Sequence, residues 1–405
     1  MRFNEPMTAV ERKAGIGLSS IFALRMLGLF LLLPVFAVHA QEIPGENAQL
    51  LAGLALGAYG FTQALFQLPY GTLSDRFGRK PVIAFGLTLF ALGCIIAALS
   101  DTLYGIILGR ALQGAGAVSA AVTALAADLT RDAQRTKIMA MIGVSISLVF
   151  AVSMVGAPVL YAAIGLSGLF WFTAILAVSA IVVLFRYVPD APPLPRVRGG
   201  RLMEVLRNGP VMRLNIGIFF LHLIQMAMWV LIPSMLKQQG LDIGAHWKIY
   251  LPAVLASFVV MIPLIILAEK RGLMKQVFSA SILILAAVQV GFFAYGKSLT
   301  ALTLWLALFF VAFNVLEALL PSSISRVASG HTKGTALGIY NTLQSVGLFL
   351  GGLLGGALAQ RYGGGTVFLA CALLALIWFG LTATMRLSSF QSSTGQLTDP
   401  VENIN

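Results

Sequence analysis

The sequence carries very little charge, and this shortage is the first guide to its class. Only 10% of its 405 residues are Asp, Glu, Lys or Arg, whereas 58% are hydrophobic and the mean hydropathy is +0.90. Soluble domains of ordinary composition carry about 25% charged residues. The composition therefore excludes an ordinary soluble enzyme and indicates a protein that crosses a membrane many times.

Cysteine is also scarce, and several catalytic motifs are missing. Cys94 and Cys371 both lie inside apolar runs, where we expect them to serve as packing residues. Two isolated cysteines exclude a disulfide framework, and we expect no metal and no cofactor. The motifs GxxxxGK[ST], HExxH and GxSxG do not occur. Their absence argues against drive by ATP and against a membrane-embedded hydrolase, so we expect a protein that is not an enzyme.

Long apolar runs predict the membrane helices. A spanning helix needs about 20 apolar residues, and lipid requires every backbone polar group to be satisfied within the helix. The sequence contains twelve such runs: 15–39, 48–73, 80–99, 102–128, 134–164, 167–188, 210–238, 245–270, 273–296, 299–328, 331–361 and 364–388. We therefore expect an all-α membrane protein with twelve transmembrane helices.

The distribution of Lys and Arg predicts the orientation in the membrane. With the N-terminus in the cytoplasm, 21 of the 27 basic residues fall in cytoplasmic segments. Four fall on the opposite side, namely Lys237, Lys248, Lys297 and Arg361. Because basic residues are retained on the cytoplasmic side, both termini are expected there, in a bacterial cytoplasmic (inner) membrane. The net charge of +12 thus sets topology, and we expect no nucleic-acid partner.

A connection rich in Pro, Gly and Arg follows the sixth run, at 186–213. This composition is typical of a linker between two halves of the chain. The expected division is an N-terminal six-helix bundle (1–188), a cytoplasmic linker (189–209), a C-terminal six-helix bundle (210–389) and a short polar tail (390–405).

An internal repeat supports the two halves. LSDRFGRKPV follows the second run, and LAEKRGLMKQV follows the eighth. When these two segments are aligned, Asp75 corresponds to Glu269 and Gly78 corresponds to Gly272. Parallel repeats of this kind are typical of transporters that are built from two six-helix bundles.

Three motifs carry a resemblance to a known family. GTLSDRFGRKP, at 71–81, resembles the signature loop of the major facilitator superfamily, and RALQGAGA, at 110–117, resembles a second motif. VGAPV, at 155–159, weakly resembles a third. The stretches FALRMLGLFLLLPVF and FFVAFNVLEALLPS are similar to YajR-type proton-driven efflux proteins. Those relatives often carry a small C-terminal cytosolic domain, which we expect this chain to lack.

The resemblance assigns the signature loop to a cytoplasmic gate. Its residues are Gly71, Asp75, Arg76, Gly78, Arg79 and Lys80, together with Asp128. Asp75 is expected to face the helix start at 335–338, where free N–H groups favour an acid, and Arg79 is expected to pair with Asp128. Each contact is worth about 1–3 kcal/mol. The alternative is a loop that only fixes the orientation in the membrane.

Ionisable residues at membrane depth are costly and are candidates for function. Arg25, Arg110 and Glu317 lie in runs that the resemblance places beside a central cavity. Burial favours the neutral form of Glu317 and a nearby arginine favours its charged form, so this carboxyl is a candidate proton carrier. The alternative is a structural ion pair, or a hydrogen bond between Asn314 and Glu317. His222 is a further proton-coupling candidate, with hydrogen bonding as its alternative.

Neutral polar residues recur at helical spacing and are candidates to line the cavity. They are Tyr59, Gln63, Gln67, Gln225, Trp229, Asn314, Asn341 and Gln344. Hydrogen bonding between helices is the alternative role for each of these stripes.

Together these features predict a secondary active transporter. The preferred interpretation is a proton-coupled antiporter that exports small apolar or cationic compounds by alternating access. One alternative is a proton-coupled importer of a sugar or other metabolite, and another is a non-transporting membrane sensor or scaffold. We expect a monomer in the lipid bilayer whose partners are protons and a small-molecule substrate.

Overall fold

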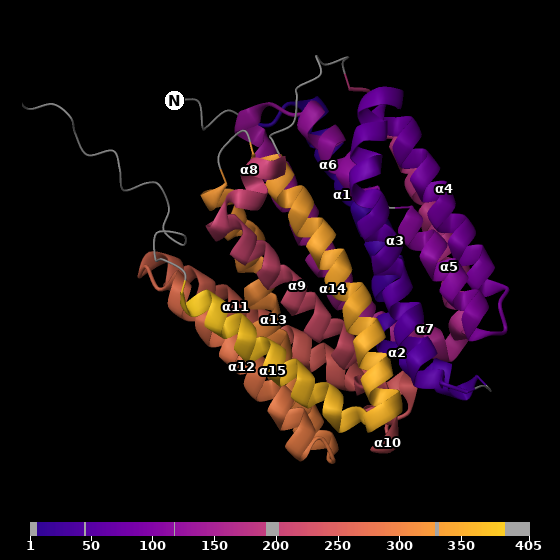
Figure 1. Cartoon of the computed structure of the whole chain (residues 1–405). Helices are drawn as coiled ribbons and strands as arrows, with labels where there is room; N and C mark the ends of the chain where they lie inside the picture. The colour runs from indigo at the N-terminus through magenta and orange to yellow at the C-terminus, as the bar shows by residue number, and fades with distance from the viewer. Residues whose placement is uncertain (1–5, 44–45, 117, 192–201, 329–331, 385–405) are drawn as a thin grey trace, which may run out of the picture.

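The computed structural model describes residues 6–43, 46–116, 118–191, 202–328 and 332–384 (Figure 1). Residues 192–201 of the predicted linker and the whole predicted polar tail lie outside these residues. The described part of the chain is helical throughout its regular secondary structure. The predicted all-α class is therefore confirmed.

Sixteen helical elements follow one another along the chain. The first seven are α1 (Ala9–Phe30), α2 (Leu33–Glu42), α3 (Ala48–Phe77), α4 (Arg79–Ala98), α5 (Leu103–Ala115), α6 (Ser119–Asp128) and α7 (Asp132–Arg186). The short α8 (Leu202–Arg207) precedes α9 (Gly209–Trp229), α10 (Ile232–Gln238) and the 3₁₀ turn η1 (Ile243–Ala245). The last five are α11 (Trp247–Lys270), α12 (Met274–Tyr295), α13 (Leu299–Val327), α14 (Lys333–Tyr362) and α15 (Gly364–Ala383).

The number of membrane crossings agrees with the sequence. Eleven segments of the described chain are long and apolar enough to span a membrane. One of them covers 50 residues of α7, about 75 Å of helix against a hydrocarbon core about 30 Å thick. Gly165 interrupts α7 with φ 66° and ψ −176°, between the predicted runs 134–164 and 167–188. Because α7 supplies two crossings, the prediction of twelve is confirmed.

The first and seventh crossings are each broken near a proline, which the apolar runs did not predict. Between α1 and α2 the break falls at Leu31 and Leu32, and α2 has Pro34 in its first turn. Between α9 and α10 the break precedes Pro233, which lies in the first turn of α10. Proline lacks an N–H and is tolerated where a helix begins. Each of these crossings therefore has a separate outer segment.

The internal repeat is visible in the backbone. Gly78 joins α3 to α4 with φ 94°, and Gly272 lies between α11 and α12 with φ 68°. Residues other than glycine are strained at such angles. The two matched glycines thus make the same kind of sharp turn at corresponding points of the repeat.

Two groups of helices make up the molecule, and α3 and α14 lie side by side where the groups meet (Figure 1). We call α1–α7 the N-terminal half and α9–α15 the C-terminal half. A Cβ atom on Gly53 would overlap the backbone of Gly352, and one on Gly57 would overlap the backbone of Phe349. Such close approach at small residues is typical of helix packing in membranes.

The same two helices separate toward their cytoplasmic ends. A Cβ atom on Gly338, near the start of α14, would meet no atom within 4 Å. On α3, a Cβ atom added to Gly71 would have the Cβ of Ala120, in the same half, as its nearest neighbour at 3.9 Å. The expected orientation places these ends in the cytoplasm. The seam between α3 and α14 is therefore closed on the periplasmic side and open on the cytoplasmic side.

This packing predicts opposite responses to one added methyl group. Gly53→Ala would force α3 away from α14, and overpacking of this kind costs about 1–3 kcal/mol. Gly338→Ala is the matched control, because its methyl group enters open space. Thermal unfolding in detergent should show a lower melting temperature for Gly53→Ala than for the unmodified protein. Gly338→Ala should leave the melting temperature unchanged. Equal melting temperatures would contradict the close approach.

Candidate functional site

Arg25 lies on α1, near the middle of the first crossing (Ala9–Glu42), and is almost completely buried, with 1% of its surface exposed. Its Nη1 donates to Ser119 Oγ at 2.9 Å, and its Nη2 donates to Tyr59 Oη at 2.5 Å. These partners come from α6 and α3, so one guanidinium group ties three helices of the N-terminal half together. Its Nε has no hydrogen-bond partner in the structure.

Arg110 of α5 is buried against the same tyrosine. Its guanidinium carbon lies 4.9 Å from the centre of the Tyr59 ring, a favourable cation–π distance. Its side chain donates to Gln113 Oε1 at 2.7 Å and to the carbonyl oxygen of Ala55 at 3.3 Å. Within the described part of the chain, neither Arg25 nor Arg110 forms an ion pair with a carboxylate. Tyr59 thus lies between two buried cations whose hydrogen-bond partners among the described residues are neutral groups.

The other polar residues of α3 continue the same buried face. Gln63 and Gln67 follow Tyr59 at intervals of one helical turn, and both are buried. Gln63 Oε1 and both polar atoms of the Gln67 amide lack hydrogen-bond partners in the structure. The predicted stripe therefore points into the N-terminal half.

A second polar cluster lies in the C-terminal half. His222 Nε2 of α9 lies 2.8 Å from Gln344 Nε2 of α14 and 3.8 Å from Glu317 Oε2 of α13. His222 Nδ1 lies 3.3 Å from the carbonyl oxygen of Ile218. A neutral imidazole that carries its proton on Nδ1 satisfies both hydrogen bonds, because Nε2 then accepts from the Gln344 amide.

Glu317 has different neighbours from those the sequence suggested. Asn314 donates to Ser257 Oγ at 2.7 Å rather than to Glu317. His222 and Tyr340 are titratable groups close to Glu317, and no described arginine lies within ion-pair distance of it. Among the described residues, Glu317 Oε2 is buried and has no hydrogen-bond partner, whereas a third of the side chain, 33%, is exposed. The exposed part of the side chain therefore belongs to its other atoms, and Oε2 itself is shielded from solvent.

The remaining candidates to line the cavity differ in how deeply they are buried. Trp229 is fully buried, with its ring 5.6 Å from the Tyr250 ring and 6.3 Å from the Phe310 ring. Gln225, one turn away on α9, is buried, and Asn341 on α14 is partly buried. Trp229 therefore belongs to the aromatic packing of the C-terminal half.

An aromatic cluster that no sequence pattern predicted joins the two halves. Phe150 of α7 lies 6.0 Å from Phe313 and 6.1 Å from Phe310, both on α13, measured between ring centroids. Phe30, at the end of α1, lies 5.1 Å from Phe150. We call these four residues the aromatic block. No spacing signal marks them, because phenylalanine is common in every apolar run.

The aromatic block shows where Glu317 lies relative to the boundary between the two halves. Phe313 and Glu317 are four residues apart on α13 and therefore share one helix face. Since α13 runs toward the cytoplasm in the expected orientation, Glu317 lies one turn on the cytoplasmic side of the block. His222 accompanies it, with its ring 5.9 Å from the Phe313 ring.

The cytoplasmic loop contains the predicted contact between Arg79 and Asp128. Arg79 Nε lies 2.7 Å from Asp128 Oδ2, which links the start of α4 to the end of α6. Arg79 Nη1 also lies 2.5 Å from Asp75 Oδ1 and donates to Ser74 Oγ at 2.6 Å. Arg79 therefore gathers the ends of three helices of the N-terminal half.

Asp75 does not occupy the position that the resemblance implied. Its ion pair is with Arg79, its side chain is 56% exposed, and Gly338 of α14 faces open space. Among the described residues, no hydrogen bond or ion pair joins Asp75 to the start of α14. The physical reason is the separation of α3 and α14 at this end, which leaves Asp75 in the loop of its own half.

The other loop residues, Gly71, Arg76 and Lys80, each have their own neighbours. Gly71 is partly buried near Ala120, and Arg76 is exposed with its guanidinium carbon 5.3 Å from the centre of the Phe77 ring. Lys80 lies 2.6 Å from Asp190 Oδ1 and donates to the carbonyl oxygen of Val188. Lys80 thus ties the start of α4 to the chain that follows α7.

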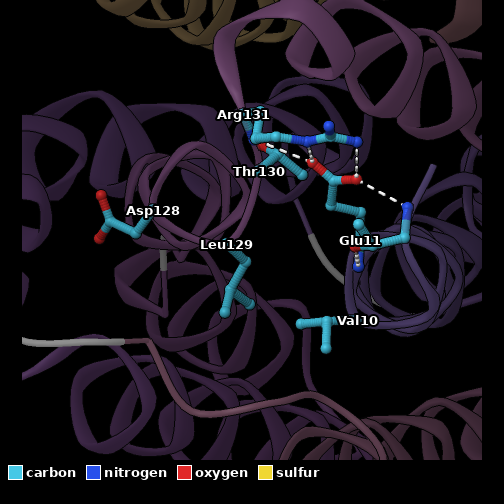
Figure 2. A pocket seen from close by; sticks show the side chains of 7 residues that line it. Val10, Glu11, Asp128, Leu129, Thr130 and Arg131 are labelled. Atoms are coloured by element: carbon cyan, nitrogen blue, oxygen red, sulfur yellow. Dashed lines mark hydrogen bonds and ion pairs between the residues drawn. The ribbon is translucent and has the colours of Figure 1, made fainter. Parts of the chain in front are cut away.

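A further charged contact closes this end of the N-terminal half (Figure 2). Both carboxylate oxygens of Glu11, in the first turn of α1, accept from the guanidinium group of Arg131, at 2.9 Å and 3.0 Å. Thr8 caps α1 and also contacts Glu11. A pocket of about 340 Å³ lies here, with Asp128 on its opposite side.

The C-terminal half has a related contact at its cytoplasmic end, in which the basic partner comes from α13. Glu269, which the internal repeat matches to Asp75, pairs with Arg326 at the end of α13 at 2.8 Å. In the N-terminal half, Asp128 holds the corresponding position on the fourth crossing. Each half is therefore fastened within itself at its cytoplasmic end. In the described part of the chain, no cluster of three or more His, Cys, Asp or Glu residues is arranged to hold a metal ion.

Comparisons with known proteins agree with this architecture. The sequence model of the Major Facilitator Superfamily matches residues 18–351 and 247–399. The chain is 45% identical to the inner membrane transport protein YajR of Escherichia coli, over 96% of this chain and 86% of that protein. It is 24% identical to the multidrug resistance protein MdtH of Aeromonas hydrophila, over 85% of this chain and 87% of that protein.

A solved structure shows the same fold at low sequence identity. The crystal structure of a D-xylose–proton symporter superposes with a TM-score of 0.73, at 14% identity, over 93% of this chain and 99% of that one. This similarity concerns the arrangement of the helices alone.

The Arg25 cluster yields a prediction about stability. Tyr59→Phe would remove the acceptor of Arg25 Nη2 and leave a buried charged donor unsatisfied, at a cost of about 1–3 kcal/mol. Tyr104→Phe is the matched control, because the Tyr104 side chain is exposed. Only Tyr59→Phe should lower the melting temperature in detergent. An unchanged melting temperature for Tyr59→Phe would contradict the bridging role of its hydroxyl group.

Proposed function

This chain belongs to the major facilitator superfamily, and from that premise we propose that it is a proton-coupled antiporter of a bacterial inner membrane. It exports small apolar or cationic compounds by alternating access of two six-helix bundles (residues 1–188 and 210–389) to a central chamber. The transporter family, rather than any catalytic constellation, argues that the chain is not an enzyme. Its similarity to an inner membrane transport protein and to a multidrug resistance protein supports the location and the direction.

The observation that carries the proposal is the placement of Glu317. It is an acid within a membrane crossing, it lies beside the seam next to the aromatic block, and His222 is 3.8 Å from its Oε2. Ionisable groups at this depth are retained at a high cost in free energy and mark ion pathways. A third of the Glu317 side chain, 33%, is exposed, which supports access of protons to this site.

The two residues suit a shared proton. In the neutral state His222 accepts from Gln344, as described above. When His222 takes up a proton on Nε2, the new N–H needs an acceptor, and Glu317 Oε2 is the unpartnered oxygen next to it. The pair therefore stores a proton on either partner without leaving a buried charge isolated.

The apolar and cationic preference rests on the surroundings of this pair. The aromatic block provides apolar and π-rich surface, which suits hydrophobic compounds and organic cations. Glu317 supplies the negative charge, and the guanidinium groups of Arg25 and Arg110 are buried behind Tyr59 within the N-terminal half. A substrate between the two halves therefore contacts the carboxyl group of Glu317 and the aromatic rings rather than the buried guanidinium groups.

Transport in reconstituted vesicles tests the proposal. With a panel of hydrophobic cations and sugars, we expect uptake of hydrophobic cations into vesicles whose lumen is acidic, when the substrate-loading side corresponds to the cytoplasm. One pH unit stores about 1.4 kcal/mol per proton, enough for about tenfold accumulation. Accumulation of a sugar in the same direction as protons would instead support the importer. Absence of flux for every compound would favour the sensor or scaffold.

Glu317→Gln should separate binding from coupling. The amide keeps the shape of the side chain and cannot carry the proton. We therefore expect exchange of labelled for unlabelled substrate to persist while accumulation driven by the pH gradient falls from about tenfold per unit to about onefold. Asp101→Asn, in an exposed loop, is the control for loss of one acid. Unchanged gradient-driven accumulation by Glu317→Gln would remove this residue from the coupling mechanism.

The signature loop is proposed to act as a gate in the other conformation, where Asp75 reaches the start of α14. Asp75→Asn should leave the protein folded and slow turnover, because losing a contact of about 1–3 kcal/mol between the halves shifts the two states by about 5–150-fold. Arg79→Ala should have the same effect, because Arg79 pairs with Asp75 and positions its carboxylate. Arg12→Ala removes one exposed cytoplasmic charge and serves as the control. Wild-type transport rates in both loop variants would contradict the gate.

A further inference from the structure

The outer segments of the first and seventh crossings contact each other across the boundary between the two halves. Both α2 and α10 begin with a proline in their first turn and follow a break in their crossing, as described above. We call α2 and α10 the outer tips. They are in contact, although they belong to different halves of the chain. A break near a proline lets each tip change its angle to the rest of its crossing.

Two polar contacts join the outer tips. Lys237 Nζ lies 2.6 Å from Glu42 Oε1, and Gln41 Nε2 donates to Ser234 Oγ at 3.0 Å. In each contact one partner belongs to α2 and the other to α10. The ion pairs at the cytoplasmic ends, by contrast, lie within one half. Among the described residues, Glu42 and Lys237 form the one ion pair that crosses from half to half.

The loop after α10 strengthens the same contact. Ile243, at the start of η1, is buried in an apolar cluster whose other members, among them Val35 and Leu169, belong to the N-terminal half. The next residue, Gly244, is so close to α7 that an added Cβ would lie 3.0 Å from the Cβ of Ala162. A residue of the C-terminal half is thus inserted into the N-terminal half. Any opening of this side has to withdraw it.

We propose that the contacts between Glu42 and Lys237 and between Gln41 and Ser234 form a periplasmic clasp. The clasp holds the outer tips together while the cytoplasmic side is open. It releases when the halves rock toward the outward-facing state, and Ile243 then leaves its apolar cluster. The clasp rests on alternating access, but it does not depend on which substrate or ion is transported.

The strength of the clasp suits a reversible gate. Both charged side chains are about half exposed, and exposed ion pairs contribute modestly. The pair therefore shifts the balance between the two states by a few-fold and does not lock the protein in one of them.

Chemical labelling of a cysteine at residue 243 tests the clasp without any substrate. In the parent variant Ile243→Cys, the thiol is buried while the periplasmic side is closed and exposed when it opens. The natural Cys94 and Cys371 are buried within the two halves and stay unreactive. The rate of modification by a membrane-impermeant thiol reagent, added to intact cells from the periplasmic side, then reports opening.

Charge changes in this parent should give a graded result. Glu42→Gln and Lys237→Gln should each speed labelling about two- to fivefold, because the exposed pair is lost. Lys237→Glu should speed it further, since two acids then face each other. Combining Glu42→Lys with Lys237→Glu restores an opposite-charge pair and should return labelling close to the parent rate. Lys248→Gln, an exposed change nearby in the first turn of α11, is the control and should leave the rate unchanged.

Two results would overturn the clasp. One is labelling of the single variants at the parent rate, and the other is labelling of the charge-exchanged pair as fast as that of Lys237→Glu. Rapid, complete labelling of the parent would also overturn it, because the periplasmic side would then be open. Melting temperatures distinguish opening from unfolding, and Gln41→Leu tests the second contact without a change in charge. Loss of proton coupling in the transport assay would leave these outcomes unaffected.

Discussion

The backbone-to-backbone approach of α3 and α14 is the constraint on which the rest of the structure depends. At Gly53 and Gly57 the two helices come so close that a methyl group does not fit. Dispersion contacts at this distance are numerous, and in lipid they replace the hydrophobic effect as the source of helix association. Because the helices touch on one side and separate on the other, their crossing decides which face of the seam is closed.

Charged contacts divide the molecule into parts that move together and parts that separate. The pairs of Arg79 with Asp128 and of Glu269 with Arg326 each fasten the cytoplasmic end of one half. A rocking motion leaves such pairs intact, so each half retains its shape. The pair of Glu42 with Lys237 lies across the seam, and it has to break before the periplasmic side opens.

The sequence predicted those features that depend on composition along one helix. Twelve crossings, the match of Gly78 with Gly272 and the pair of Arg79 with Asp128 all followed from hydropathy, the repeat or the motif. The breaks before Pro34 and Pro233 escaped it, because a hydropathy run continues through a break. The aromatic block escaped it as well, because contacts such as Phe150 with Phe313 depend on how two separate halves are placed.

Buried charge is distributed unequally between the halves, and this inequality connects the proton to the motion. Arg25 and Arg110 give the interior of the N-terminal half a permanent positive charge, whereas Glu317 gives the C-terminal half a charge that a proton cancels. Opposite charges attract across a medium of low dielectric constant more strongly than across water. If Glu317 carries the proton, its charged form draws the halves together around the central chamber and its neutral form does not. Protonation then changes the relative free energies of the two arrangements, which is the requirement for coupling an ion gradient to a conformational change.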